Sequence, residues 1–187
     1  MLAAVSFIPG RVRAISAGSS LVLDPVGHQV LESRQADRKS LIASTTKIMT
    51  GLIICESCNV LEQVKIPKEA VGIEGSSLYL KEGEVLTVQD LLYGMMLRSG
   101  NDAAAALAIH CAGSADRFAE LMNRKAAELG MKNSHFENPH GLDGQHHYST
   151  AADLGILGEA AMANPIFAKN RIHKDRKGRV PAAEKPQ

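Results

Sequence analysis

Hydrophobic and polar positions form short extended patterns near the start of the chain and longer helical patterns after it. Residues 15–23 are rich in Ile, Val, Leu and Ser, and residues 28–32 resume an extended pattern after the turn Asp24-Pro25-Val26-Gly27. The two runs predict a β-hairpin. Residues 41–54 are mostly apolar, with a few polar residues near their beginning, and predict a buried helix.

Three helices are expected nearly back to back in the middle of the chain. Thr87, with Asp90 three residues later, resembles a capping box and predicts a helix over residues 88–97. An Ala-rich helix is expected over residues 102–111, and another over 114–129, where the first serine is the cap.

Short apolar pieces alternate with Gly and Pro in the remaining segments, which favours loops and small strands. The expected elements are strands at 64–66 and 77–80, a loop at 133–148 with a short strand near Phe136, and a helix from the Thr150 cap to residue 163.

The same patterns predict three parts of the chain. Residues 1–14 are expected to be a poorly ordered start or a degenerate signal remnant, because no Lys or Arg precedes their apolar stretch. Residues 15–168 are expected to fold as one domain. Residues 169–187, dominated by Lys, Arg, Pro and Ala, are expected to be a disordered basic tail of the kind that follows a frameshift or premature end.

Composition limits the function more than it defines it. The 187 residues, 45% of them hydrophobic, suffice for one core, and a net charge of +1 gives no reason to expect nucleic acid. Aromatic residues make up 4% and Trp is absent, which leaves few rings for base stacking. The three cysteines are an odd number, so no disulfide framework is expected, and Cys55-x-x-Cys58 lacks the partners of a zinc site.

Two short motifs carry candidate catalytic chemistry. In a helix, Ser44 and Lys47 lie one turn apart, so the lysine can accept the serine proton if burial lowers its pKa. Ser-x-x-Lys alone occurs by chance in a chain of this composition. Ser99-Gly100-Asn101 adds a hydroxyl that can relay a proton and an amide that can hold a substrate, although a helix-joining turn with a cap residue explains it equally well.

The order and spacing of three motifs resemble serine-type D-alanyl-D-alanine carboxypeptidases, the low-molecular-mass penicillin-binding proteins. The resemblance covers residues 15–168. The motifs are Ala43-Ser44-Thr45-Thr46-Lys47-Ile48-Met49-Thr50, Leu97-Arg98-Ser99-Gly100-Asn101-Asp102-Ala103-Ala104 and Glu137-Asn138-Pro139-His140-Gly141-Leu142-Asp143.

The resemblance implies an α/β (α+β) fold of the β-lactamase/transpeptidase type, helix-rich, with an N-terminal β-hairpin and an incomplete antiparallel sheet. It implies that Ser44 attacks the penultimate D-alanine of a peptidoglycan stem peptide ending in D-Ala-D-Ala, with Lys47 as base. Ser99 would relay protons and Asn101 would hold the substrate. The Ser44 N–H would help to form an oxyanion hole. β-Lactams would acylate Ser44, no metal or other cofactor is required, and the location is extracytoplasmic.

The chain departs from the family in one motif. No Lys-Thr-Gly occurs in the sequence, although the family carries it on a strand that walls the active site and binds the substrate's terminal carboxylate. We therefore expect the chain to be truncated before that motif and its activity to be impaired. The sheet edge left open favours self-association.

Other interpretations remain at this stage. The chain is alternatively a noncatalytic cell-wall or partner-binding remnant, or a β-lactamase-like hydrolase, although no Glu is placed by motif as a deacylating base. A metal site is suggested by four residues that lie close together in the sequence: His140, Asp143, His146 and His147. The resemblance instead explains His140 as part of a turn. One further set is expected to edge the cleft: Glu74, Ser76, Ser77 and Tyr79.

Overall fold

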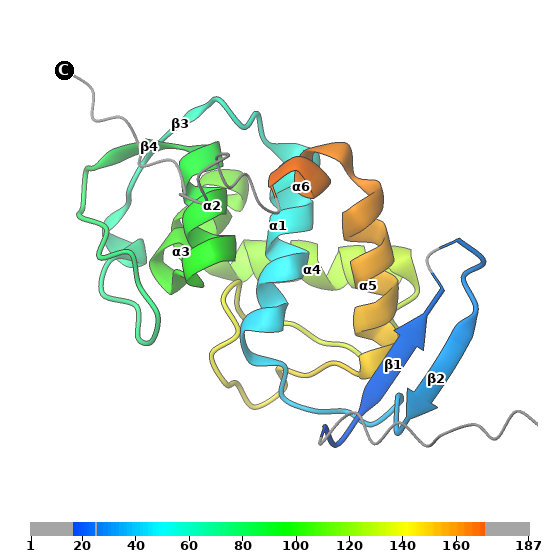
Figure 1. The fold of residues 1–187 in the computed structure, drawn as a ribbon. Coiled ribbons are helices and arrows are strands. Elements are labelled where there is room, and N and C mark those ends of the chain that lie inside the picture. The colour runs from blue at the N-terminus through cyan, green and yellow to red at the C-terminus, as the bar shows by residue number, and fades with distance from the viewer. Residues whose placement is uncertain (1–16, 25, 171–187) are drawn as a thin grey trace, which may run out of the picture.

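The fold is a group of helices flanked by two small antiparallel sheets (Figure 1). The computed structural model describes residues 17–24 and 26–170, so the predicted segment 1–14 and most of the predicted tail lie outside the described residues. The elements are β1 (Ser20–Leu23), β2 (Val30–Arg34), the 3₁₀ turn η1 (Ala43–Thr45), α1 (Thr46–Ser57), β3 (Gln63–Lys65), the 3₁₀ turn η2 (Lys68–Ala70), β4 (Val85–Thr87), α2 (Val88–Arg98), α3 (Asn101–Ala112), α4 (Ala115–Leu129), α5 (Ala151–Ala163) and α6 (Pro165–Asn170).

β1 and β2 form the predicted antiparallel hairpin, with bounds shifted toward the C-terminus. The Asp24 carboxylate accepts the N–H groups of Val26 and Gly27 at 3.1 and 2.8 Å. The Asp24 N–H donates to the Gln29 carbonyl at 2.9 Å, so the turn is longer than the sequence indicates. β1 packs against α5, where Gly155 leaves room for the side chains of Leu21 and Leu23. The hairpin is therefore attached to the helices through one strand (Figure 1).

α1 is the central helix of the molecule and contacts the five other α-helices. The predicted helix 41–54 is wrong at both ends, because the α-helix begins at Thr46 and ends at Ser57. Ala43 has a φ of 44°, a left-handed conformation that an α-helix excludes, so the chain first forms η1. Ser44 consequently lies in this turn, just before the helix.

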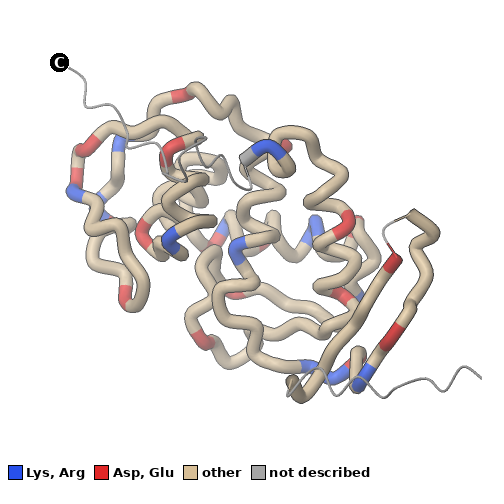
Figure 2. Tube along the Cα trace, in the orientation of Figure 1, with Lys and Arg blue, Asp and Glu red and all other residues tan. Residues whose placement is uncertain are grey.

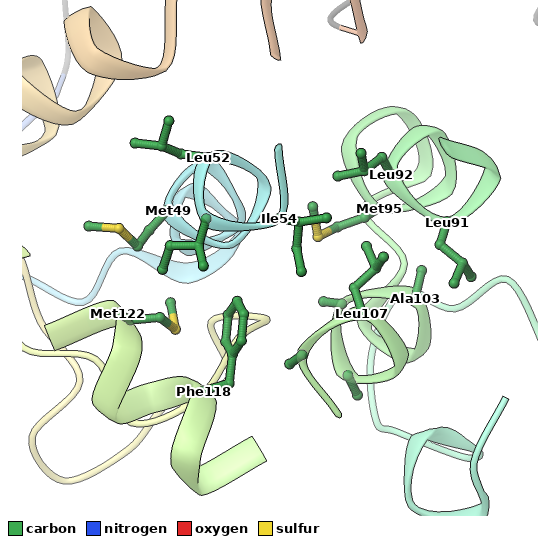
Figure 3. Packing of buried hydrophobic residues seen from close by; sticks show 14 of the residues in the cluster. Met49, Leu52, Ile54, Leu91, Leu92, Met95, Ala103, Leu107, Phe118 and Met122 are labelled. Atoms are coloured by element: carbon green, nitrogen blue, oxygen red, sulfur yellow. The ribbon is translucent and has the colours of Figure 1, made fainter. Parts of the chain in front are cut away.

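The helices predicted after Thr87 and Ser114 are confirmed together with their caps. The Thr87 hydroxyl accepts the Asp90 N–H at 3.1 Å in a complete capping box at the start of α2. Ser114 accepts the N–H of Arg117 at 3.2 Å at the start of α4. Buried side chains of α1, α2, α3 and α4 meet in one apolar core (Figure 3).

The prediction of a strand at 77–80 is wrong. The Asp102 carboxylate accepts the backbone N–H groups of Leu78 and Leu80 at 3.0 and 3.1 Å and the Ser77 hydroxyl at 2.7 Å. These bonds replace the pairing that a strand needs. The predicted strand at 64–66 is present as β3, and its partner β4 was not foreseen.

The region after α4 is a long loop followed by two helices. The loop pairs only at isolated bridges, His135 with Tyr148 and Ser40 with Ser149. The Thr150 hydroxyl accepts the Asp153 N–H at 3.1 Å and caps α5 as predicted. α6 was not predicted, and it extends to residue 170, past the expected domain boundary at 168.

Charged residues of both signs are distributed along the chain, in keeping with the net charge of +1 (Figure 2). In the part of the chain that the structure describes, no helix is both long enough and apolar enough to cross a membrane.

Candidate active site

Ser44 and Lys47 lie at the entrance to α1 and face each other. The Lys47 Nζ is 3.2 Å from the Ser44 Oγ. Ser44 is exposed in η1, whereas Lys47, in the first turn of α1, is only 3% exposed. The arrangement therefore places a reachable hydroxyl beside a buried amine.

Burial changes the proton affinity of that amine. Desolvation lowers the pKa of Lys47 from 10.5 to about 8. Its Nζ also donates to the backbone carbonyl of His140 at 2.7 Å. The amine is thus held in one place, and a substantial fraction of it is neutral near pH 8.

Ser99 and Asn101 reach the same place from the junction of α2 and α3. Ser99 directly follows α2 as its C-cap, with a φ of 57°, and its Oγ donates to the Ser44 Oγ at 2.9 Å. Asn101 begins α3, is buried, and donates its Nδ2 to the Glu74 carbonyl at 2.6 Å. The left-handed residue between two helices is what turns the Ser99 hydroxyl toward η1.

The loop that contains Asn138 and Gly141 forms the third part of the site, beside the start of α1 and the junction of α2 and α3. The Asn138 Oδ1 accepts the Gly141 N–H at 2.7 Å, and its Nδ2 donates to the Leu142 carbonyl at 2.8 Å. Gly141 has a φ of 90°, and a Cβ built there would overlap the carbonyl group of Ala43. The loop therefore lies directly against the backbone that precedes Ser44.

Two threonines of α1 attach this loop to the helix. The Thr46 Oγ1 is 2.7 Å from the Nε2 of buried His147, and the Thr50 hydroxyl donates to the Pro139 carbonyl at 2.7 Å. The His147 Nδ1 accepts the Glu137 N–H at 3.0 Å, so the Nε2 carries the proton that is donated to Thr46. These bonds position the His140 carbonyl against Lys47.

Ser44 and Asn101 border an open cleft of about 600 Å³. Two of the four residues expected at its edge, Glu74 and Ser76, do line it. Ser77 instead donates to Asp102, and Tyr79 points into solvent with 86% of its surface exposed. The lining residues are Ala43, Ser44, Glu74, Gly75, Ser76, Asn101, His140, Gly141, Leu142 and Asp143.

The histidines of the loop serve different purposes. His147 is buried between Thr46 and Glu137, while His146 is exposed. Burial, followed by the charges of Lys47 and His147, lowers the pKa of His140 to about 4, so His140 is neutral at pH 7. Among the described residues, no group of three or more His, Cys, Asp or Glu side chains is arranged to hold a metal ion.

Sequence reasoning missed the backbone groups of the site. The carbonyls of His140 and Glu74 hold Lys47 and Asn101, and no residue type marks a carbonyl as an acceptor. The Asn138-Pro139 pair indicates a turn, but nothing in the sequence shows that the turn lies against Lys47, 93 residues away.

Residues of all three motifs named in the sequence analysis thus line one cleft. The sequence profile of the D-alanyl-D-alanine carboxypeptidase family, Peptidase_S11, matches residues 7–183. The chain belongs to this family. The family assignment and the mixed fold of helices and small antiparallel sheets confirm the class expected from the resemblance.

Individual members of the family show the same relation. D-alanyl-D-alanine carboxypeptidase DacF of Bacillus subtilis is 37% identical over 161 residues, covering 83% of this chain and 41% of the relative. The crystal structure of DacD from Francisella tularensis superposes with a TM-score of 0.86 at 30% identity, over 91% of this chain and 43% of that one. The carboxypeptidase structure from Mycobacterium tuberculosis H37Rv has a TM-score of 0.80 at 36% identity, over 84% and 60%. The chain therefore spans less than half of the length of curated relatives such as DacF.

Proposed function

We propose that this chain is a serine-type D-Ala-D-Ala carboxypeptidase that acts on peptidoglycan stem peptides through an acyl-enzyme on Ser44. The observation that carries the proposal is the contact of Ser44 with both Lys47 and Ser99, at 3.2 and 2.9 Å. Family membership supplies the reaction class, since the matching profile describes D-alanyl-D-alanine carboxypeptidases.

In the first step, Lys47 takes the proton of Ser44 as the oxygen attacks the carbonyl carbon of the penultimate D-alanine. The neutral amine is the active form, and its lowered pKa makes that form accessible near neutral pH. The backbone N–H of Ser44, at the positive end of α1, stabilises the oxyanion that forms.

In the second step, the bond between the two alanines breaks and the terminal D-alanine leaves. Ser99, which already donates to the Ser44 Oγ, passes a proton to the leaving amine. Asn101 binds the substrate peptide: one hydrogen of its amide is used by Glu74, and the other is available for a substrate carbonyl. Water then hydrolyses the ester and frees Ser44.

We further propose that the chain of 187 residues acts slowly, because its sequence contains no Lys-Thr-Gly to bind the terminal carboxylate. β-Lactams acylate it more readily than peptides do. Their ring opens without releasing a separate fragment, so a slow site still accumulates the adduct. A protein that acts on peptidoglycan must lie outside the cytoplasm, because its substrate does.

The proposal also includes self-association through the hairpin, because β2 is exposed along its whole length.

The test is covalent labelling with a fluorescent penicillin, followed by mass spectrometry of the intact chain. We expect one adduct on the wild type, none on Ser44→Ala, and normal labelling of Ser33→Ala, a matched change in exposed β2. Release of D-alanine from a peptide ending in D-Ala-D-Ala, compared with penicillin turnover, separates the carboxypeptidase from a β-lactamase. A folded wild type that takes no label at any dose refutes the proposal and favours a noncatalytic protein.

A further inference from the structure

Two thiols meet at the ends of α1 and α3 that lie away from the cleft. Cys58 directly follows α1, and Cys111 lies in the last turn of α3. α1 and α3 pack against each other, both cysteines lie against the same apolar core, and their side chains are close enough to interact. Both helices thus begin at the candidate active site and end at this thiol pair, about 18 Å further along each helix.

The pairing differs from the one that the sequence suggests. Cys55-x-x-Cys58 is the visible motif, but Cys55 is buried, with 4% of its surface exposed. Cys58 and Cys111 are partly exposed, although both also pack against the apolar core. A small reagent can therefore reach them, whereas the core encloses Cys55.

The two thiols are not equivalent. The hydrogen bond from Cys58, reinforced by one from Ser57, lowers the pKa of Cys111 to about 7 in spite of its burial. The same contact raises the pKa of Cys58, and burial and the nearby Glu62 act in the same direction. Cys111 therefore provides the thiolate, and Cys58 is the thiol that donates to it.

We propose that Cys58 and Cys111 form a redox pair, oxidised by a small disulfide of the glutathione type to an intramolecular disulfide that ties the distal ends of α1 and α3. The proposal stands independently of the acyl-transfer function. All three cysteines are present as thiols in this structure, which is the reduced state of the pair.

The exchange has two steps and balances. The Cys111 thiolate attacks one sulfur of the small disulfide, forms a mixed disulfide and expels one thiolate. Cys58 then loses its proton and attacks the Cys111 sulfur, which expels the second small thiol. The sum is two protein thiols and one small disulfide converted to one protein disulfide and two small thiols.

The bond would link helices that position the catalytic candidates. The chain between the two cysteines contains α2 and Ser99, and α3 starts at Asn101, so the closed loop encloses one side of the cleft. A cross-link over a loop of this size restricts the unfolded chain, and we expect Tm to rise by about 5 to 10 °C on oxidation.

The test is incubation of the native chain with oxidised glutathione, acid quenching, alkylation under denaturing conditions and peptide mapping. Trypsin leaves Cys55 and Cys58 on one fragment, and a Glu-specific protease separates them by cutting after Glu56. We expect the Cys58 fragment joined to the Cys111 fragment, with Cys55 alkylated. Cys58→Ser should trap glutathione on Cys111, and Cys111→Ser should react at least about tenfold more slowly.

Cys55→Ser is the matched control, and it should form the disulfide at the rate of the wild type. Its Tm should also rise on oxidation, while that of Cys58→Ser should not. The proposal is overturned if Cys58 and Cys111 of the folded chain both remain alkylatable after the incubation, or if Cys55 is the residue that is consumed.

Discussion

Lys47 shows how a single residue acquires a chemical role from its surroundings. Its side chain is almost fully buried, and among the described residues its hydrogen-bond partners are a hydroxyl and a carbonyl, with no carboxylate to fix the charge. Desolvation therefore acts unopposed on its pKa. The residue combines a fixed position with a proton that is easily lost.

This environment predicts a pH dependence of acylation. Because burial lowers the pKa of Lys47 to about 8, the neutral fraction grows by about tenfold per pH unit below that value and levels off above it. The rate of penicillin labelling should rise between pH 6 and 8 and then plateau. Lys47→Arg, which stays protonated, should show no labelling at any pH, whereas Lys132→Arg on the surface should follow the wild type. A rate that does not vary with pH in the wild type would contradict this role.

His147 provides a second prediction at the same scale. Replacing it with Leu leaves the Thr46 hydroxyl and the Glu137 N–H without their partner in a buried setting, at a cost of about 2–4 kcal/mol in the free energy of unfolding. Urea denaturation measures the loss. His146→Leu removes the same side chain from an exposed neighbouring position and should change stability by less than about 0.5 kcal/mol. Equal losses in the two variants would show that His147 does not hold the loop.

The elements that form the site are separate in the sequence and meet through close backbone contacts. The loop around Gly141 lies against η1 because the glycine has no Cβ and adopts a φ of 90°. Thr50 and Thr46 attach the rest of the loop to α1. The position of Ser44 thus depends on a turn nearly a hundred residues away.

A methyl group at that contact should separate the loop from η1. We expect Gly141→Ala to fold with reduced stability and to lose penicillin labelling by about tenfold or more, because a shift of about 1 Å displaces the carbonyl that holds Lys47. Gly130→Ala is the control: it introduces the same strain at a φ of 80° with open space around it. It should lose stability by about 1 kcal/mol and retain its labelling rate. If both variants label normally, the contact has no role in acylation.

The helices were largely predictable from the sequence, and the reason is local. Caps such as Thr87 and Ser114 and the apolar periodicity that follows them act within a few residues. The strand predicted at 77–80 fails because its backbone N–H groups are bound by Asp102, more than twenty residues later. Ser44 and Lys47 were identifiable from their motif taken together with the two motifs that follow it, whereas the carbonyls that hold Lys47 and Asn101 depend on tertiary contacts.

At the scale of the molecule, the hairpin is the part with the least cover. One strand packs on α5, while β2 is exposed throughout, including Leu31 with 66% of its surface accessible. In the described part of the chain, β1 and β2 pair only with each other. An exposed strand of this kind is a template for pairing with a second chain.

Sedimentation over a range of concentrations should therefore detect reversible association. Leu31→Lys places a charge on the strand and should shift the association to concentrations at least about tenfold higher. Val26→Lys makes a similar change in the turn, outside the strand, and should associate like the wild type. A chain that sediments as a monomer at every concentration would show that the hairpin is not an association surface.

The bond between the Lys47 amine and the His140 carbonyl joins positions 93 residues apart and closes only when α1 and the distant loop have docked. A reactive serine would thus be one of the last features to appear during refolding. If a labelled antibiotic is added at successive times after dilution from urea, the fraction of chains that it labels would report when the native state is complete. Spectroscopic signals of helix formation do not report that step.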